Sequence, residues 1–305
     1  MNVFKSIGYR VDKVCNIVKI LITRIVRVKD EVILHKKLEK YYQLDGTSDS
    51  GLELDKEPGV EFCDLFTVAF NNANFIEYQI KALKKNFVIP YRFTIFDNSN
   101  QEVCAEEIKK VCKQYRCKYI KLPKQDSKID VANSHGTALN WIWKKYMSQS
   151  SATYFGILDH DIFPIKPFNL KSYIEGQQLF GYVRKSEENV FIKQGRWYLW
   201  PGLLFFDGSY IKGKNLDFCP DWNHGLDTGG KNYFTIYKNI KLDKIKTTSP
   251  KEVKIDSTCG AYWGGYEEFD CGWIHMWNGS GYTHSEKWKE KYNNFICILD
   301  KSLSE

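Results

Sequence analysis

Two aspartates one residue apart, Asp159 and Asp161, are the residues of this sequence whose spacing most directly suggests chemistry. They follow an apolar run at residues 154–158, which predicts a strand buried on both faces of a parallel sheet. The carboxylates would then lie at the carboxyl end of that strand, where open α/β sheets bind their ligands. Two carboxylates this close repel each other unless a cation lies near them, and oxygen ligands suit Mg²⁺ or Mn²⁺. Asp-x-Asp also occurs in solvated loops, so the motif alone does not distinguish a metal site from a loop. The secondary structure around the motif bears on this distinction.

Strands and helices alternate in the part of the chain that precedes the aspartate pair. The predicted strands are residues 65–70, 91–96 and 117–122, and the predicted helices are 74–85, 102–115 and 138–147. This alternation with short connections predicts a parallel sheet with right-handed crossovers. We therefore expect an α/β fold with a mostly parallel sheet flanked by helices, in which the aspartate pair follows the fourth strand.

The composition is that of a folded domain in a reducing compartment. The chain has 305 residues, of which 43% are hydrophobic, so it can bury one large core. Its nine cysteines have no regular spacing, which indicates neither a disulfide framework nor a structural zinc site. We expect a cytoplasmic protein.

The N-terminal segment is basic and amphipathic. Residues 1–29 contain seven Lys or Arg and one Asp, so seven minus one gives +6 of the total charge of +7. Because the rest of the chain is close to neutral, a nucleic-acid partner is not expected. Apolar residues from Phe4 to Val32 recur at spacings of three and four, which predicts a helix with one apolar face.

Three interpretations of this helix remain open: it lies in a membrane surface, it forms a coiled coil that makes the protein a homo-oligomer, or it packs on its own domain. Basic residues beside the apolar face favour a membrane surface, contacted through residues 1–34 on the inner face of the membrane. Small and polar residues then predict a linker. The predicted domains are a helix at 1–44, a linker at 45–60 and an α/β domain at 61–298.

The ordered set of motifs resembles the GT-A fold of nucleotide-sugar glycosyltransferases, in particular family-2-like members with an Asp-x-Asp motif. The resemblance rests on Asp97-Asn98 after the second strand, the segment Ser134-His-Gly-Thr-Ala-Leu-Asn140 before the central strand, and Leu158-Asp-His-Asp161. It runs in order from residue 64 to 167 and continues more loosely to 282. In this family the Asp-x-Asp holds a divalent cation on the diphosphate of the donor.

The resemblance implies roles for several residues. Asp161 would bind Mn²⁺ or Mg²⁺ directly, Asp159 would reach the metal through water or contact the donor ribose, and His160 would point away. Many members of the family also bring a C-terminal histidine back to the metal; His275 fits this position, with His284 as a second choice and a structural role as the alternative. The residues expected to bind the donor and its sugars are Asn71, Asp97, Asn140, Asp159, Trp197 and Trp200.

The second half of the chain is expected to bind the acceptor. Trp197 and Trp200 precede a predicted strand at 203–206 and could stack on sugar rings or pack in the core. Asp227 occupies the region where the family carries an acid facing the acceptor hydroxyl, the general base of inverting members. It could instead cap the following helix. Glu267 and Glu268 are the competing candidates for the base.

The predicted function is metal-dependent transfer of a sugar from a nucleotide-sugar donor to a glycan or glycolipid acceptor, in cell-surface or capsular polysaccharide synthesis. A divalent cation would neutralise the charge that develops on the leaving diphosphate. Two alternatives stay open: a catalytically inactive, membrane-associated carbohydrate-binding protein on the same scaffold, and a sugar-phosphate nucleotidyltransferase. The second should carry a glycine-rich basic loop after its first strand, where this sequence has Asn71-Asn-Ala-Asn74.

Overall fold

A computed structural model describes residues 33, 35–48, 61–125, 131–186, 195–255, 265–279 and 286–305, with the backbone alone at 131 and 132. The chain divides into two compact units, Met1–Asp45 and Gly46–Glu305. In the first unit, the described residues are helical at 33 and 35–43. The amphipathic helix predicted from residues 1–34 thus lies almost wholly outside the described residues. Among the residues that are described, no helix is both long enough and apolar enough to cross a membrane.

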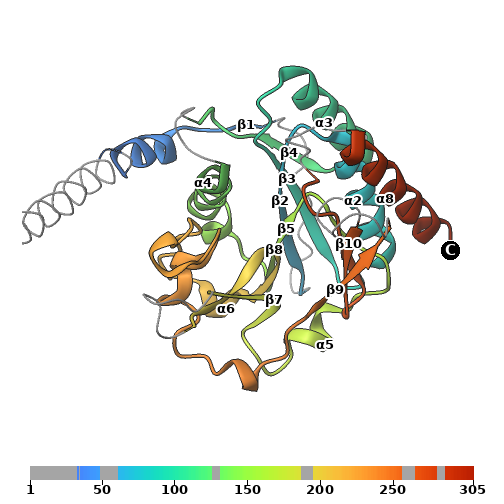
Figure 1. Ribbon diagram of the computed structural model, residues 1–305. Helices are drawn as coiled ribbons and strands as arrows, with labels where there is room; N and C mark the ends of the chain where they lie inside the picture. Colours follow the sequence, from blue (N-terminus) through green and yellow to red (C-terminus); the bar gives the residue numbers. More distant parts are fainter. Residues whose placement is uncertain are drawn as a thin grey trace, which may run out of the picture. The chain divides into compact units, whose positions relative to one another are not determined.

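The second unit is built on a seven-stranded sheet in the order β1-β4-β3-β2-β5-β8-β7 (Figure 1). The four strands β4, β3, β2 and β5 are parallel, whereas β1 and β8 run antiparallel to their neighbours β4 and β5. The strands are β1 (Thr47–Ser48), β2 (Cys63–Ala69), β3 (Tyr91–Asp97), β4 (Lys118–Lys121), β5 (Tyr154–Asp159), β7 (Leu179–Lys185) and β8 (Trp197–Asp207). All seven residues of β2 are buried, as expected for the centre of a parallel sheet covered on both faces.

Helices cover both faces of this sheet. Helices α2 (Ala73–Asn86) and α3 (Glu102–Tyr115) lie on one side and α4 (Val131–Lys145) on the other (Figure 1). The connection from β4 to β5 reverses the direction in which strands are added, and a right-handed crossover then places α4 on the opposite face. The reversal creates a switch point between β2 and β5, where such sheets bind ligands. The predicted α/β architecture with a mostly parallel sheet is confirmed.

A second, four-stranded antiparallel sheet begins directly after the aspartate pair. Its order is β6-β11-β10-β9. The strands are β6 (Ile162–Pro164), β9 (Pro250–Lys254), β10 (Gly265–Phe269) and β11 (Trp273–His275). Since β5 ends at Asp159 and β6 begins at Ile162, the first aspartate ends β5 and the second lies in the turn that joins the two sheets. The sequence pattern did not predict this second sheet.

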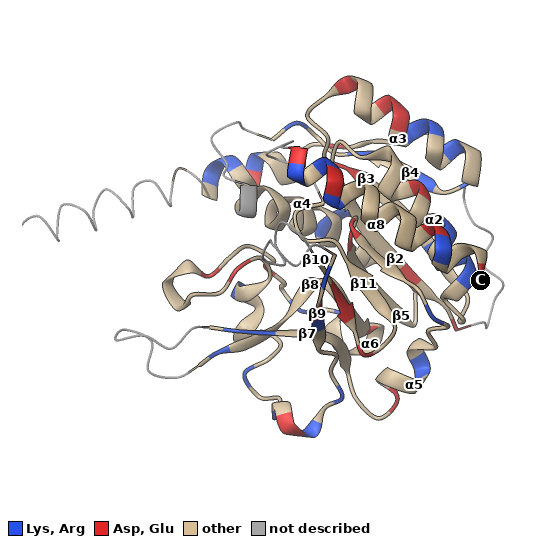
Figure 2. Cartoon of the chain, turned by 45° about the vertical axis from the view of Figure 1, so that its right-hand side comes forward, with Lys and Arg blue, Asp and Glu red and all other residues tan. Residues whose placement is uncertain are grey.

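In the described part of the second unit, the other helices are α5 (Leu170–Ile174), α6 (Gly208–Ile211) and α8 (Glu286–Ser304), with short 3-10 turns at Met147–Gln149, Trp222–His224, Gly230–Tyr233 and Leu242–Lys244. Helix α8 packs on α2, and its buried residues include Phe295 and Leu299. It ends at Ser304, beyond the predicted domain limit of 298. Charged residues of both signs lie along α2, α3 and α8 (Figure 2).

Three further predicted boundaries differ clearly from the structure. The predicted linker at 45–60 contains β1, which pairs with β4. Helix α4 begins seven residues before the predicted position 138 and contains Gly136; a Cβ there would lie 2.7 Å from the Phe218 carbonyl oxygen, so glycine permits a close backbone contact. Strand β8 extends well before the predicted 203–206, since a register irregularity in its pairing with β7 accommodates Pro201-Gly202.

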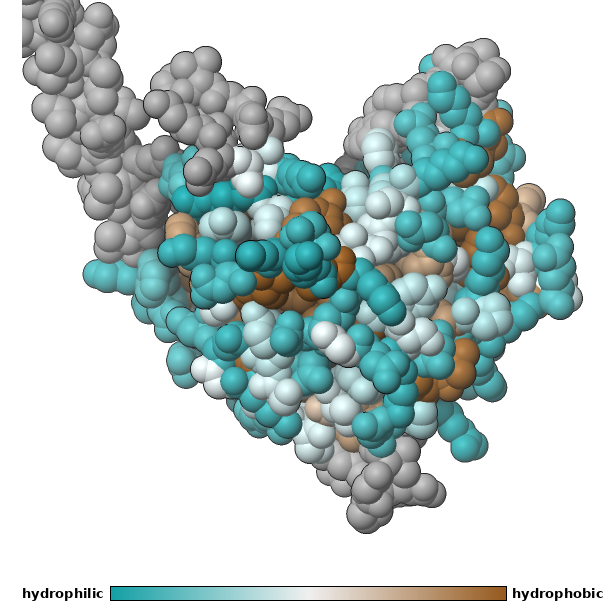
Figure 3. All heavy atoms as spheres, turned by 90° about the horizontal axis from the view of Figure 1, so that it is seen from below, coloured by the Kyte–Doolittle hydropathy of each residue, from teal (hydrophilic) through white to brown (hydrophobic). Residues whose placement is uncertain are grey.

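The face seen in Figure 3 is mostly hydrophilic, with separate hydrophobic patches between the hydrophilic side chains. Exposed large apolar residues in the described part of the chain include Val88, Val103, Trp222 and Phe234. Single apolar side chains at a surface are normal and do not identify a binding site.

Candidate active site

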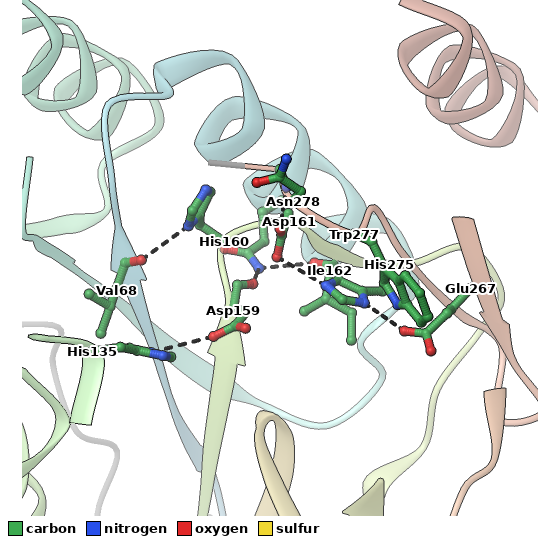
Figure 4. A network of polar contacts seen from close by, with 12 residues as sticks. Val68, His135, Asp159, His160, Asp161, Ile162, Glu267, His275, Trp277 and Asn278 are labelled. Carbon is green, nitrogen blue, oxygen red and sulfur yellow. Dashed lines mark hydrogen bonds and ion pairs between the residues drawn. The ribbon is translucent and has the colours of Figure 1, made fainter. Parts of the chain in front are cut away.

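The turn that carries Asp159 and Asp161 is fixed from behind by Gln79 of helix α2. The Gln79 side chain is fully buried, and its Nε2 donates hydrogen bonds to the carbonyl oxygens of Asp159 at 2.7 Å and Ile162 at 2.9 Å. One amide group thus holds both ends of the turn between β5 and β6. His160 points away from the carboxylates, with its Nδ1 3.3 Å from the Val68 carbonyl oxygen (Figure 4), which confirms the predicted orientation.

Asp159, Asp161 and His275 form a three-residue cluster. One potential ligand atom from each lies within 4.8 Å of the others, and Asp161 and His275 are buried. Strand β11 brings His275 to the site because its Cα pairs with that of Ile162, the first residue after the aspartates. His275 Nε2 lies 3.5 Å from Asp161 Oδ1. The three residues predicted to hold the metal therefore come together from segments more than 100 positions apart in the sequence.

Glu267 lies behind His275. It is buried, and its Oε2 lies 2.8 Å from His275 Nδ1, the ring nitrogen opposite the one that faces Asp161 (Figure 4). A carboxylate in this position makes Nδ1 the protonated nitrogen and leaves Nε2 for a metal. Glu267, predicted as a competing general base, thus lies where it orients the histidine.

Glu268 lies on the opposite face of β10. Successive residues of a strand point to opposite faces, so Glu268 cannot share the environment of Glu267. Its Oε1 lies 3.6 Å from Nζ of Lys166, an exposed lysine. Glu268 is therefore directed away from His275 and toward an exposed lysine, and its role as a general base stays a prediction.

Burial and neighbouring charges shift the pKa values of the cluster. Burial raises the pKa of Asp159 above its usual value, and the charge of Asp161 adds to this effect. Burial would also raise the pKa of Asp161, but His275 outweighs it and lowers the pKa to about 2. Burial would lower the pKa of His275, but Asp161 and Glu267 outweigh it and raise the pKa to about 9. Without a metal, a histidinium therefore partly compensates the carboxylates.

The donor set fits a divalent cation. Two carboxylates and an imidazole nitrogen converge, and the second nitrogen of the imidazole already has an acceptor in Glu267. Carboxylate oxygens suit Mn²⁺ and Mg²⁺, and an imidazole suits transition metals better than Mg²⁺, which prefers an all-oxygen shell. The raised pKa of His275 shows that the surroundings favour a positive charge at this position.

The chain segment after His275 closes one side of Asp161. The N–H groups of Met276 and Gly279 donate to the backbone carbonyl oxygen and to Oδ2 of Asp161, both at 3.0 Å. A Cβ at Gly279 would lie 2.4 Å from Asp161 Cβ, so only glycine permits this approach. Asp161 is therefore held in place by the same segment that supplies His275.

Asp97, expected to bind the donor, is fully buried at the end of β3. Its Oδ2 accepts hydrogen bonds from Tyr119 Oη at 2.8 Å and Lys121 Nζ at 3.0 Å, and its Oδ1 accepts the Ser99 N–H at 2.8 Å. These bonds engage both oxygens in shaping the loop after β3. Asp97 thus stabilises the conformation of the loop after β3.

Asn71, also expected at the donor site, joins two loops at the carboxyl edge of the sheet. Its backbone N–H donates to Ser99 Oγ at 2.8 Å and its Nδ2 donates to Asn100 Oδ1 at 2.7 Å. Asn71 has a φ of 49°, in the left-handed region that asparagine tolerates better than most residues. The loops after β2 and β3 are thereby tied to each other.

Asn140, also expected at the donor site, joins helix α4 to another part of the domain. Its Nδ2 donates to Asp217 Oδ1 at 2.8 Å, and its Oδ1 accepts the N–H of Phe218 at 2.7 Å. These bonds fasten α4 to the segment after α6. Asn140 is buried at this junction, which accounts for a polar residue on the inner face of the helix.

The two predicted tryptophans have different surroundings. The buried Trp200 ring packs against His275, with ring centroids 4.8 Å apart, so it forms a wall beside the candidate ligand. Trp197 packs against Tyr237 at 5.2 Å. Trp200 therefore contacts a residue of the candidate site, whereas Trp197 contacts a buried residue of the core.

Asp227 is exposed, and its Oδ1 accepts the N–H of Thr228 at 2.7 Å. The adjacent turn lies against β8, since a Cβ at Gly229 would lie 3.1 Å from the Pro201 ring. Within the described residues, no contact joins Asp227 to the cluster of Asp159, Asp161 and His275. The alternative metal ligand His284 lies outside the described residues.

Two polar residues of the site were not predicted from the sequence. His135 of α4 places its Nε2 3.4 Å from Asp159 Oδ1 (Figure 4), and Gln79 holds the turn. His135 stands inside the segment 134–140 that carried the family resemblance, so the signal was present there. Gln79 is a polar residue on the apolar face of α2, a pattern that can indicate a buried hydrogen-bonding role.

No protein-family model matches this sequence, and no curated protein matches it significantly. Similar solved structures include glycosyltransferases. Mannosyltransferase PcManGT from Pyrobaculum calidifontis, in complex with GDP-Man and Mn²⁺, has a TM-score of 0.33 and 8% identity over 59% of this chain and 52% of its own. Glucosyl-3-phosphoglycerate synthase from Mycobacterium tuberculosis has a TM-score of 0.38 and 14% identity over 62% of this chain and 69% of its own.

The structure of S. aureus TarS has a TM-score of 0.34 and 13% identity over 52% of this chain. The match spans only 30% of the TarS chain and about half of the PcManGT chain. These are distant similarities, which do not by themselves assign a function to this protein. The α/β architecture and the position of the Asp-x-Asp turn are those that the GT-A resemblance implied.

Proposed function

We propose that this protein is a metal-dependent glycosyltransferase that takes its sugar from a nucleotide-sugar donor. The observation that carries the proposal is the cluster of Asp159, Asp161 and His275 at the carboxyl end of β5. This cluster lies beside the switch point of a mostly parallel sheet, where a nucleotide can bind along the loops after β2 and β3. A diphosphate is a suitable ligand for a cation that keeps several free coordination positions.

Each residue of the cluster has a distinct task in this proposal. Asp161 and His275 hold the cation, and Asp159 completes the site or contacts the donor ribose. Glu267 keeps His275 Nε2 available, and Trp200 restricts the rotation of the imidazole ring through its packing contact. When bound, the cation neutralises charge on the diphosphate leaving group. We expect Mn²⁺ to bind more tightly than Mg²⁺ because one ligand is a nitrogen.

In our proposal, Asp227 is the general base that takes the proton of the acceptor hydroxyl, if the reaction inverts the anomeric configuration. Its carboxylate is exposed, and only its Oδ1 is engaged among the described contacts, which leaves Oδ2 for an acceptor. We propose a glycan or glycolipid as the acceptor, in cell-surface or capsular polysaccharide synthesis. The exposed position suits an acceptor that is itself large.

A thermal-shift panel tests the proposed donor site. The full chain is measured with nucleoside diphosphates and nucleotide sugars, each in Mn²⁺, Mg²⁺ or EDTA, alongside Asp161→Asn. A ligand at 100 times its Kd should stabilise the fold by about 2.7 kcal/mol, a rise in Tm of a few degrees. We expect a metal-dependent shift with at least one nucleotide, lost in Asp161→Asn.

Two results would contradict the proposal. If the folded protein shows no shift with any nucleotide but binds glycans, it is a carbohydrate-binding protein. If it releases pyrophosphate from a nucleoside triphosphate and a sugar 1-phosphate, it is a nucleotidyltransferase. The Asp161→Asn variant must keep the melting behaviour of a folded protein for either comparison to count.

We also propose that residues 1–34 attach the protein to the inner face of a membrane, on the basis of the sequence pattern alone. Co-sedimentation with vesicles that contain phosphatidylserine, in parallel with neutral vesicles, tests this attachment. A variant that lacks residues 1–44 should lose binding to the anionic vesicles. Equal binding by both forms would contradict a membrane role for the helix, and a change of oligomeric state in the truncated form would favour the coiled coil.

A further inference from the structure

Helix α8 carries a lysine on its buried face. Lys291 is only 2% exposed and belongs to the same face as Phe295 and Leu299. By contrast, the side chain of Lys289 on this helix is 56% exposed. Lysine is rarely buried unless its ammonium group has specific partners. The partners of Lys291 should therefore explain its position.

Those partners belong to the segment that follows His275. Lys291 Nζ donates to the carbonyl oxygen of Trp277 at 2.6 Å, and Trp288 Nε1 donates to that of Asn278 at 2.7 Å. Two side chains of α8 therefore bind two consecutive carbonyl groups. Asn278 has a φ of 60°, a left-handed conformation that most residues avoid, and the surrounding contacts must hold it there.

The other side of the same segment contacts Asp161. As described above, the N–H groups of Met276 and Gly279 both bond to this aspartate. The segment 276–279 is thus held between Asp161 on one side and helix α8 on the other. His275 directly precedes it, so a shift of the Trp277 carbonyl group would displace both the histidine and the Gly279 N–H that orients Asp161.

We infer that Lys291 is a positioning residue for the candidate metal site, acting through the backbone of the segment 276–279. The inference rests on the proposed metal-dependent function. Helix α8 would then stabilise the geometry of the metal site, although it contributes no ligand. Lys291 would hold His275 and Asp161 at the separation that a cation needs.

Charge and position predict opposite effects when Lys291 is neutralised, which makes the inference testable. The charges of Asp161 and Glu267 act on Lys291, although burial outweighs them and lowers its pKa to about 8. An ammonium group near the cluster repels a cation, so removing its charge alone should tighten metal binding. Removing its hold on Trp277 should weaken metal binding, because partners outside the ligand set typically contribute 10- to 100-fold to metal affinity.

The test compares the Mn²⁺ affinity of the full-length protein and its variants by isothermal titration calorimetry at pH 7, with electron paramagnetic resonance of bound Mn²⁺ as a second readout. In Lys291→Met, which keeps the length but loses the donor, we expect a Kd for Mn²⁺ at least tenfold higher. Lys291→Arg, which keeps a cationic donor, should recover much of the affinity. Lys289→Met on the exposed side of α8 is the matched control and should bind like the unaltered protein.

The possible outcomes separate the inference from the proposed function. If the unaltered protein does not bind Mn²⁺, the proposed function fails. If it binds and Lys291→Met binds equally well or more tightly, the positioning role is wrong. Should Lys291→Met not fold, Trp288→Phe removes the other hydrogen bond from α8 to this segment, the Nε1 donor to Asn278, together with part of the ring that stacks on Tyr292. Unchanged Mn²⁺ affinity in that variant would show that the hold of α8 on the segment 276–279 does not position the ligands and would overturn the inference; a several-fold loss would support it.

Discussion

Glu267 and His275 stand directly opposite each other on the neighbouring strands β10 and β11, and Glu267 Oε2 lies 2.8 Å from His275 Nδ1. Cross-strand pairing fixes this contact, since directly opposed side chains on one face of an antiparallel pair are close neighbours. The pair faces Asp161 through the other ring nitrogen of His275. The tautomer of the histidine, and with it the ability of Nε2 to bind a metal, is therefore set by a strand pairing.

Replacing Glu267 by Gln should weaken Mn²⁺ binding about tenfold, the lower end of the range for a residue that orients a metal ligand. Glutamine can still accept a hydrogen bond from Nδ1, but it does not carry the charge that supports the imidazole. Glu268→Gln, on the opposite face of the same strand, is the control and should leave the affinity unchanged. A loss of turnover in Glu267→Gln with normal Mn²⁺ affinity would restore Glu267 as a candidate base.

Replacing Asp227 by Asn should spare donor binding and lower kcat on the order of 10²-fold or more, if Asp227 is the general base. Donor binding by thermal shift and turnover with an identified acceptor would be measured on the same preparation. Asparagine keeps an oxygen that can accept the Thr228 N–H, so the local turn should survive. Turnover at the normal rate would leave Asp227 with only its role in this turn.

The metal-free protein should lose stability as the pH rises from 6.5 to 8. His275 has a folded-state pKa raised from 6.5 to about 9, so its contribution is complete below pH 6.5 and is lost as the pH rises toward 9. Over the 1.5 units up to pH 8 the unfolding free energy should fall by about 1.5 kcal/mol, because the unfolded histidine is already half deprotonated at pH 6.5. The pKa of Lys291 is lowered to about 8, so its titration increases the unfolding free energy as the pH rises, mainly above pH 8.

Urea unfolding in EDTA at pH 6.5 and 8 measures this change, with His275→Gln as the reference. The variant should show a clearly smaller pH dependence, because the titrating group is gone. Equal pH dependence in the unaltered protein and in His275→Gln would show that His275 does not titrate as described.

At acid pH, Asp161 should make a second contribution to the pH dependence of stability. Its pKa is lowered from 3.8 to about 2, so its stabilising contribution is complete above pH 3.8 and is lost as the pH falls toward 2.

Replacing Gly136 by Ala should destabilise the protein by about 1–3 kcal/mol, the usual cost of an overpacked contact. Alanine raises helix propensity by about 1 kcal/mol, so the sign of the result decides between propensity and packing. The new Cβ would lie 2.7 Å from the Phe218 carbonyl oxygen and 2.8 Å from Cys219 Cα, and backbone atoms cannot move as easily as a side chain. A higher Tm for Gly136→Ala would contradict the close contact between α4 and this segment.

Much of the fold could be predicted because its signals are local. The apolar run of β5 and the amphipathic pattern of α3 follow from side-chain periodicity, and the predicted limits of α3 agree with the structure. The predicted start of α4 at residue 138 was wrong. Gly136 resembles a helix boundary in the sequence, but in the structure it lies inside the helix and permits a close backbone contact. Local patterns cannot distinguish these two uses of glycine.

The sequence by itself determined that two carboxylates follow a buried strand of an α/β sheet, since residue order and hydrophobic pattern specify both. It also supplied His275 as a candidate ligand, although only through a family resemblance. Tertiary structure alone decided that Glu267 stands behind His275 and that Lys291 reaches the segment beside it. These roles depend on strand register and on helix packing between segments distant in sequence. A one-residue change of register would turn Glu267 away from the site and bring Glu268 toward it.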